Sequence, residues 1–187
     1  MTVISRSPFL SVLLGLLILA QLGGCADSSQ SEAQKLKPDL IKAAKINVQL
    51  GLAYLEKNDM SRAKKTLLLA KREAPQEPSV WYGMGYFLER TGELKAAEEH
   101  YRVALGLNAN AGPALNNYGT FLCRQRRYAE ALKAFEQAVA DPNYLEPAVA
   151  YENAGLCALK IPDQHLAKHY FQEAKAKDPN VSKWDHE

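Results

Sequence analysis

The stretch YGTFLCRQRRYAEALKAFEQAV, residues 118–139, carries the spacing that decides the fold. Its glycine, Gly119, is followed by Ala131 twelve residues later, by Phe135 four residues after that, and by Ala138 three residues further on. The same glycine position recurs at intervals of 34, 34 and 36 residues, at Gly51, Gly85, Gly119 and Gly155. A fixed period of this length predicts that the chain is built from internal repeats.

Small and large residues recur together in the repeat, which is the tetratricopeptide pattern of paired antiparallel helices. The glycine and the alanine are expected where the two helices of a unit cross, because only small side chains allow close backbone approach there. Large residues are expected to fill the space beside each crossing, at Leu67, Tyr101, Phe135 and Phe171. Such units bury their apolar faces only against neighbours, so we predict an all-α tetratricopeptide-repeat solenoid of about four units.

Aligning the repeat along the chain gives predicted units over residues 44–77, 78–111, 112–145 and 148–181, within a repeat domain over 38–187. We expect the first helix to begin at Pro38, because proline is favoured in the first helical turn. Asp59 and Asp163 follow the turns of the first and fourth units. Both are expected to cap the second helix of their unit.

The connection to the fourth unit is longer than the others by two residues, within ADPNYLEPAVA. We expect Tyr144 to cover the seam between the third and fourth units. After Pro179 only NVSKWDHE follows, and we expect Trp184 to fold back over the apolar stripe of the last helix. The alternative is that this stripe docks a partner or a second copy.

Residues 1–24 have the layout of a secretory signal peptide, with one cation at Arg6, an apolar core and then small residues. The apolar core is shorter than the about 20 residues that a spanning helix needs. The four residues LGGC that end at Cys25 resemble the lipobox of bacterial lipoproteins. This resemblance implies that the Cys25 thiol carries lipid and anchors the chain to a membrane. An ordinary cleavage site beside an incidental cysteine is the alternative.

The residue after Cys25 bears on sorting, since an aspartate there retains enterobacterial lipoproteins in the inner membrane. Ala26 occupies the position in this chain. We therefore expect an outer-membrane lipoprotein that faces the periplasm. Residues 25–37 are rich in Ser, Gln and Lys, and predict a flexible tether between the lipid and the repeat domain.

The formal net charge of +2 is spread over the chain without a field of one sign, so we expect no nucleic-acid partner. No nucleophile motif or glycine-rich phosphate loop occurs, and we expect neither an enzyme nor a small-molecule substrate nor a cofactor. His165 and His169 lie four residues apart but lack a third ligand nearby. They are expected on a solvated helix face, and we predict no metal site.

Cys123 and Cys157 lie on the first helices of consecutive predicted units, two positions apart in repeat register. Neighbouring first helices pack side by side in a solenoid, and export would place the pair where disulfides persist. We expect a disulfide between them. Two buried free thiols that act as small hydrophobic residues are the alternative.

A partner-binding groove is expected on the first helices, where residues one turn apart face the ligand. The predicted groove residues are Val48, Leu52, Leu55, Tyr82, Tyr86, Asn116, Thr120, Glu152 and Leu156. Glu89, Arg124 and Leu159 extend the same face. Its first half is apolar and aromatic, which suits an amphipathic helix or an extended apolar segment of a partner. A carboxylate clamp is not expected, because Val48 and Leu52 stand where such clamps use Lys and Asn.

Residues 115–160, LNNYGTFLCRQRRYAEALKAFEQAVADPNYLEPAVAYENAGLCALK, resemble the type IV pilus biogenesis and stability lipoproteins, the PilF/PilW group of pilotins. The two stretches that contain cysteine, NNYGTFLC and YENAGLCALK, both resemble this family. The resemblance implies a protein that binds the secretin subunit of the pilus machine and promotes its outer-membrane localisation and oligomerisation. A general envelope scaffold that recruits peptidoglycan hydrolases or proteases is the alternative.

Overall fold

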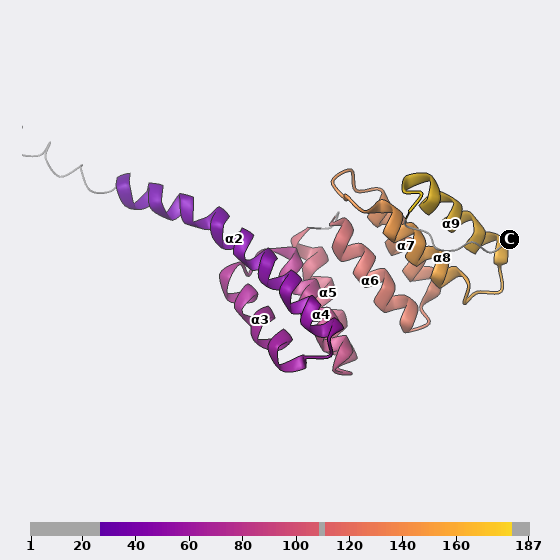
Figure 1. Cartoon of the computed structure of the whole chain (residues 1–187), viewed down its shortest axis with the longest axis horizontal. Helices are drawn as coiled ribbons and strands as arrows, with labels where there is room; N and C mark the ends of the chain where they lie inside the picture. The colour runs from indigo at the N-terminus through magenta and orange to yellow at the C-terminus, as the bar shows by residue number, and fades with distance from the viewer. Residues whose placement is uncertain (1–26, 109–110, 181–187) are drawn as a thin grey trace, which may run out of the picture. The chain divides into compact units, whose positions relative to one another are not determined.

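The computed structural model describes residues 27–108 and 111–180, and over these residues its regular elements are all helices (Figure 1). In chain order these are α2 (Asp27–Glu56), α3 (Met60–Glu73), α4 (Pro78–Arg90), α5 (Leu94–Leu107), α6 (Gly112–Arg124), α7 (Tyr128–Val139), α8 (Pro147–Ala158) and α9 (Gln164–Lys177). None of these helices combines the length and the apolar character that crossing a bilayer requires. The all-α prediction is confirmed for this part of the chain. The predicted signal peptide, Cys25 and Trp184 lie outside it.

Residues Ile41–Glu187 form one compact unit, separate from Met1–Leu40. Within it the helices follow one another as antiparallel pairs, and α6 packs against both α4 and α8 (Figure 1). Val48 of α2 lies against Gly83 of α4, so α2 from Ile41 onward, α4, α6 and α8 lie in a row as the first helices of the pairs. We call the side that this row presents the first-helix face.

Each repeated glycine meets the large side chain of its own unit, as the spacing predicted. A Cβ atom built on Gly119 would lie 2.8 Å from Cε1 of the Phe135 ring, and one on Gly155 would lie 2.6 Å from the ring of Phe171. A Cβ atom on Gly51 would lie 2.7 Å from Cγ of the Leu67 side chain. These separations are shorter than van der Waals contact, so glycine lets the large residue seat fully between the paired helices.

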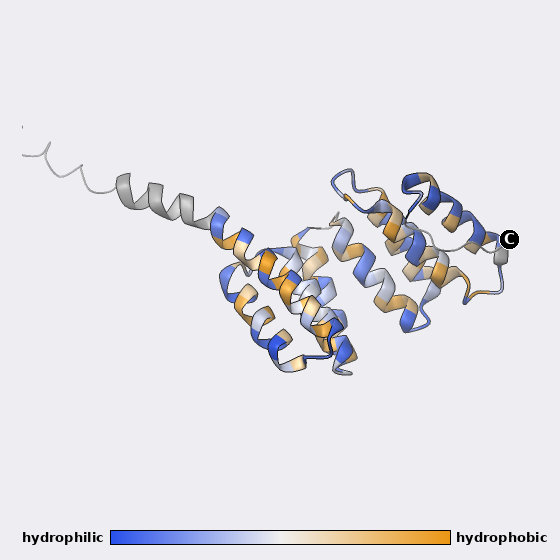
Figure 2. Ribbon diagram, in the orientation of Figure 1, coloured by the Kyte–Doolittle hydropathy of each residue, from blue (hydrophilic) through white to orange (hydrophobic). Residues whose placement is uncertain are grey.

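The core consists of two main apolar clusters and a smaller one, and Figure 2 shows the apolar residues alternating with hydrophilic ones along α3 to α9. Leu67 belongs to the first cluster, and Tyr101 and Phe135 belong to the second. Tyr82 and Tyr86 pack against both main clusters. The two halves of the solenoid therefore share one continuous interior.

Tyr144 packs in the smaller cluster with Leu115 of α6, Ala138 of α7 and Ala150 of α8. Its side chain is only 7% exposed. A Cβ atom on Gly112 would lie 2.5 Å from the Tyr144 side chain, so glycine at the start of α6 makes room for it. Tyr144 thus covers the seam where the long connection joins the third and fourth units.

The turn inside each of the first three units uses a residue with positive φ, at Asn58 (56°), Gly92 (86°) and Arg126 (62°). These residues are 34 apart, so the backbone repeats as the sequence does. Pro162 stands at the corresponding position of the fourth unit and cannot adopt this conformation. The predicted caps are confirmed, since Asp59 accepts from the amide of Arg62, and Asp163 accepts from the amide of Leu166.

The first helix differs from the prediction, because α2 begins at Asp27 and contains Pro38 in its interior. The segment expected to be a flexible tether is helical from Asp27 to Lys37. The sequence before Pro38 explains this in part, because it holds Ser, Gln, Glu, Ala and Lys without a glycine. The continuation of the helix goes against the preference of proline, which removes one backbone hydrogen bond and crowds the carbonyl of the preceding turn.

Gly119→Ala tests the role of the repeated glycines. Its methyl group would lie 2.8 Å from the Phe135 ring and 3.1 Å from the Ala131 carbonyl oxygen, so we expect the free energy of unfolding to fall by about 1–3 kcal/mol. Gly106→Ala in α5 is the matched control, because nothing lies within 4 Å of a Cβ there. Alanine at that helical site should stabilise by about 0.5–1 kcal/mol. Urea unfolding measures both, and equal stabilities of the two variants would contradict the packing role.

Candidate partner-binding face

The residues predicted to form a groove are not equally available on the first-helix face. Leu55 is 0% exposed and Val48 is 1% exposed, and both belong to the first core cluster. The prediction is wrong for Leu55 as a partner contact, because its side chain is sealed inside the first helix pair. Val48 faces the close approach of α2 to α4, where a Cβ on Gly83 would lie 3.1 Å from its Cγ1 atom.

Half-buried side chains, two of them aromatic, occupy the middle of the first-helix face. Leu52, Tyr82 and Tyr86 pack against the core with one side and keep part of their surface accessible. The guanidinium groups of Arg90 and Arg124 each lie 5.9 Å from the centroid of the Tyr86 ring. Both cations lie within the range of a cation–π contact, and Arg90 Nη1 also donates to the Tyr86 hydroxyl at 3.4 Å.

An ion pair between the exposed Arg124 and the largely buried Glu89 joins the neighbouring helices α4 and α6 on this face. Arg124 Nη2 donates to Glu89 Oε2 at 2.9 Å, and the Glu89 side chain is only 8% exposed. The hydroxyl of Tyr101 also donates to Glu89 at 3.3 Å. Burial opposes the charge on Arg124, but the hydrogen bond and the charge of Glu89 outweigh it and raise the pKa of the guanidinium. Glu89 and Arg124 thus stabilise the alignment of the two helices.

An amide hydrogen bond joins α6 and α8 in the same way. Asn153 Nδ2 donates to Asn116 Oδ1 at 3.0 Å, and the Thr120 hydroxyl donates to the Asn116 carbonyl oxygen at 2.9 Å. Asn116 and Thr120 were predicted partner contacts. Asn116 also links α6 to α8, whereas the hydrogen bond of Thr120 lies within α6. Asn153 was not among the predicted groove residues. Its position on the first helix of the fourth unit is a sequence signal that could have identified it.

The far end of the face is apolar and accessible. Leu156 is 44% exposed and Leu159 is 42% exposed. Glu152 lies one turn before Leu156 and is half-buried. Leu156 is thus the most accessible of the predicted groove residues in this unit.

The structure joins Cys123 of α6 to Cys157 of α8 by a disulfide, the pairing predicted from the repeat register. Their Cα atoms are 5.9 Å apart, and the two residues are separated by 34 positions in sequence. Cys157 is 1% exposed and Cys123 is 7% exposed, so the bond lies in the core between consecutive first helices.

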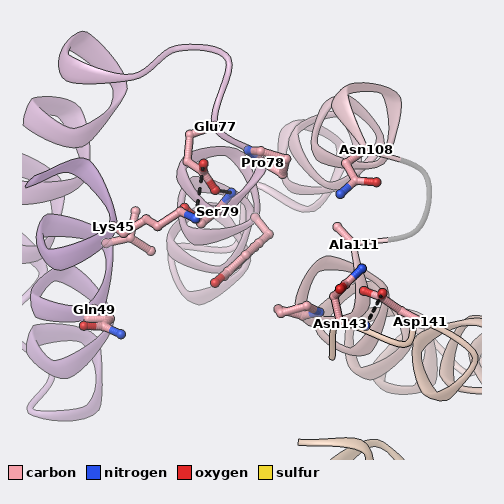
Figure 3. Close-up of a pocket in the computed structure, with 12 residues that line it drawn as sticks. Lys45, Gln49, Glu77, Pro78, Ser79, Asn108, Ala111, Asp141 and Asn143 are labelled. Atoms are coloured by element: carbon pink, nitrogen blue, oxygen red, sulfur yellow. Dashed lines mark hydrogen bonds and ion pairs between the residues drawn. The ribbon is translucent and has the colours of Figure 1, made fainter. Parts of the chain in front are cut away.

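A cavity of about 410 Å³ lies beside the first-helix face, near the N-terminal ends of α4 and α6 (Figure 3). Val48 and Tyr82 line it together with polar residues of their own two segments and of two further segments, at Asn108 and at Asp141 and Asn143.

This cavity was not predicted from the sequence. A carboxylate precedes proline at Glu77 and Asp141, but the same dipeptide pattern occurs at Glu146 and Asp178 outside the cavity and so does not mark it.

The described residues hold no group of three His, Cys, Asp or Glu side chains that could share a metal ion. His165 and His169 are exposed on α9.

The Trp81 indole nitrogen donates to the Pro75 carbonyl oxygen at 2.7 Å, and the Lys71 ammonium lies 4.1 Å from the Trp81 ring centroid. These two contacts hold the Trp81 side chain in place on α4.

Two family models match the chain. The model of the cilia and flagella-associated protein 70 middle TPR-like domain matches residues 49–147, and a tetratricopeptide repeat model matches residues 122–182. Together they cover residues 49–182, from the end of α2 to the end of α9.

Known relatives extend this comparison. The chain is 32% identical to the type IV pilus assembly protein PilF of Pseudomonas aeruginosa over 158 residues, which are 84% of this chain and 63% of PilF. It is 36% identical to an uncharacterized protein of Haemophilus influenzae over 73% of this chain and 76% of that protein. The chain thus spans less than two thirds of the length of PilF.

Solved structures agree with these relatives. The structure of P. aeruginosa PilF superposes with a TM-score of 0.67 at 32% identity, over 76% of this chain and 64% of that one. The structure of PilW, a widely conserved type IV pilus biogenesis factor, superposes with a TM-score of 0.64 at 31% identity, over 73% of this chain and 62% of that one.

Reduction tests the contribution of the disulfide to stability. The bond closes a loop of 34 residues, which in the chain-entropy model stabilises the fold by about 4 kcal/mol. We expect a reductant to lower the melting temperature of the oxidised protein, as followed by circular dichroism. The double variant Cys123→Ala, Cys157→Ala is the control and should melt at the same temperature with and without reductant. Mass spectrometry that finds both thiols alkylated without prior reduction would contradict the pairing.

Proposed function

The chain belongs to the tetratricopeptide-repeat proteins and is of the PilF/PilW type, and from this premise we propose that it acts in type IV pilus biogenesis by binding another protein of the pilus machine. The observation that carries the proposal is the 32% identity to PilF over 84% of this chain. The similarity to the PilF and PilW structures supports it. A stack of helix pairs is suited to binding because it presents an extended surface to a partner.

The proposed partner is the secretin subunit, whose outer-membrane localisation and oligomerisation the chain would promote as a pilotin. The sequence resemblance of residues 115–160 to pilotins supports this choice. The first-helix face supports the mode of binding, because half-buried aromatic residues at Tyr82 and Tyr86 are followed by exposed Leu156 and Leu159. An amphipathic helix can lay its apolar side on such a row of anchors.

Deletion of the gene tests the function in the parent bacterium. We expect secretin multimers to be lost from outer membranes and restored by the wild-type gene. The purified protein should also bring down secretin subunits from membrane extracts. Recovery of peptidoglycan hydrolases or proteases in place of secretin, with multimers unchanged, would overturn the proposal in favour of a general envelope scaffold.

Tyr86→Ala tests the face itself. Removing this aromatic anchor should weaken secretin binding by about 2 kcal/mol, or about 30-fold in Kd, as expected of an interface hot spot. Surface plasmon resonance with immobilised secretin subunits measures the change. Tyr128→Ala is the matched control, because Tyr128 also packs half-buried on the core but lies on the second helix α7. Equal affinities of the two variants would move the binding site off the first-helix face.

Localisation is part of the same proposal, since a pilotin must reach the outer membrane. The lipobox that ends at Cys25 would supply the anchor. We expect Cys25→Ser to remove the protein from outer-membrane fractions, with an unprocessed precursor on immunoblots. Ala26→Asp should move part of the population to the inner membrane in a host that follows the enterobacterial rule. Fractionation of Cys25→Ser that matches wild type would contradict the lipid anchor.

A further inference from the structure

The cavity beside the first-helix face is built by segments that are far apart in sequence. Lys45 and Gln49 come from α2, and Glu77, Pro78 and Ser79 come from the start of α4 (Figure 3). The opposite wall comes from Asn108, Ala111 and Pro113 and from the connection between α7 and α8, which contributes Asp141 and Asn143. Tyr82 and Val48 add an apolar side. At about 410 Å³ the cavity lies within the range of ligand sites, about 300–1,000 Å³.

The helix N-termini at the cavity are occupied by carboxylates of the chain itself. Glu77 Oε1 accepts from the Ser79 amide at 3.4 Å, at the start of α4. Asp141 Oδ2 accepts from the Gly112 amide at 2.9 Å, at the start of α6. The donors that would attract an anion are therefore in use, and an anionic ligand would meet two negative charges.

The charges of the cavity do not balance. Lys45 Nζ lies 3.6 Å from Glu77 Oε2, and these two groups neutralise each other. Asp141 enters no ion pair with any described residue, since its partners are the amides of Gly112 and Asn143. Those hydrogen bonds hold the pKa of Asp141 below its usual range, so its carboxylate stays ionised. The cavity therefore carries net negative charge.

Neutral polar groups complete the lining. The Ser79 hydroxyl is buried and has no hydrogen-bond partner among the described residues, although hydroxyls in such positions usually have one. Burial, with the charges of Glu77 and Glu146, raises the pKa of Tyr82 to about 12, so its hydroxyl remains a donor and an acceptor. The amides of Gln49 and Asn143 also line the cavity. Groups of this kind hydrogen-bond to peptide backbone and to the N–H groups of a cation.

We infer that this cavity receives a lysine or arginine side chain of an extended partner segment, with Asp141 and Glu77 as the groups that attract it. This inference rests on the proposed function only in that the chain binds another protein. It adds to that function a basic anchor residue in the bound segment, next to the apolar contacts on Tyr82 and Tyr86. Lys45 competes with the partner's cation for Glu77.

The test uses small peptide probes, so that it does not depend on the secretin. The ¹⁵N-labelled full chain, held in detergent micelles, is titrated with acetyl-Gly-Arg-Gly-amide and separately with acetyl-Gly-Glu-Gly-amide. We expect the amide signals of Ser79, Gly112 and Asn143 to shift saturably with the arginine probe and to stay unchanged with the glutamate probe. Saturable shifts of the same size with both probes, or with neither, would overturn the inference.

Charge variants sharpen the test. Asp141→Asn keeps an oxygen that can accept from the Gly112 amide, so α6 stays capped, but it removes the negative charge. We expect it to weaken binding of the arginine probe by about threefold, as a single accessible ion pair would. Lys45→Gln should strengthen binding, because Glu77 loses its competing cation. Glu99→Gln makes the same charge change as Asp141→Asn at an exposed site on α5, outside the cavity, and should leave the affinity unchanged.

The two proposals fail separately. If the secretin is captured but the arginine probe does not bind, the basic anchor is wrong and the pilotin function stands. If Asp141→Asn and Glu99→Gln bind the arginine probe equally, the charge of Asp141 does not attract the cation and the inference falls. If the arginine probe binds as expected and no secretin is captured, the cavity stands and the partner is another protein.

Discussion

The close crossing of the two helices in each unit, at a glycine that faces a large side chain, is the contact on which the rest of the structure depends. Gly51, Gly119 and Gly155 each leave room for one large residue of the second helix, at distances that a methyl group would close. Seating that residue fixes the angle of the pair. Repetition of the pair in turn sets the row of first helices. The candidate partner-binding residues lie on this row, and the cavity lies at its edge.

The fold was predictable because each contact that defines it is local to one unit and recurs with the period of the sequence. The turns and the caps at Asp59 and Asp163 follow from the same local signals. Two backbone details were not predictable in this way. Arg126 takes the positive φ that Gly92 takes in the unit before, so position in the repeat outweighs residue preference there. Pro38 was expected to begin a helix and lies inside one, although proline is disfavoured in a helix interior, so the helix-forming residues before it outweigh the proline.

The candidate site was predictable only where it repeats. The register predicted which cysteines would meet and placed Tyr82 and Tyr86 on the first-helix face. It did not separate exposed from buried positions in the first unit, where Leu55 is 0% exposed and Val48 is 1% exposed. The cavity was beyond the reach of the repeat pattern. It depends on Asp141 in the one lengthened connection and on Lys45 in α2, and nothing in the sequence shows that these segments meet across α4 and α6.

The links along the first-helix face are distributed unevenly, and this bears on how a partner would bind. The helices α4 and α6 share the pair of Glu89 and Arg124, and α6 and α8 share the disulfide and the amide hydrogen bond of Asn116. A face fixed in this way loses little conformational freedom on binding, so more of the contact energy appears as affinity. The polar link from α2 to α4 is the longer and more exposed pair of Lys45 and Glu77. This is also the pair that lines the cavity, so a partner's cation would replace one of the weakest links of the face and leave the strong ones in place.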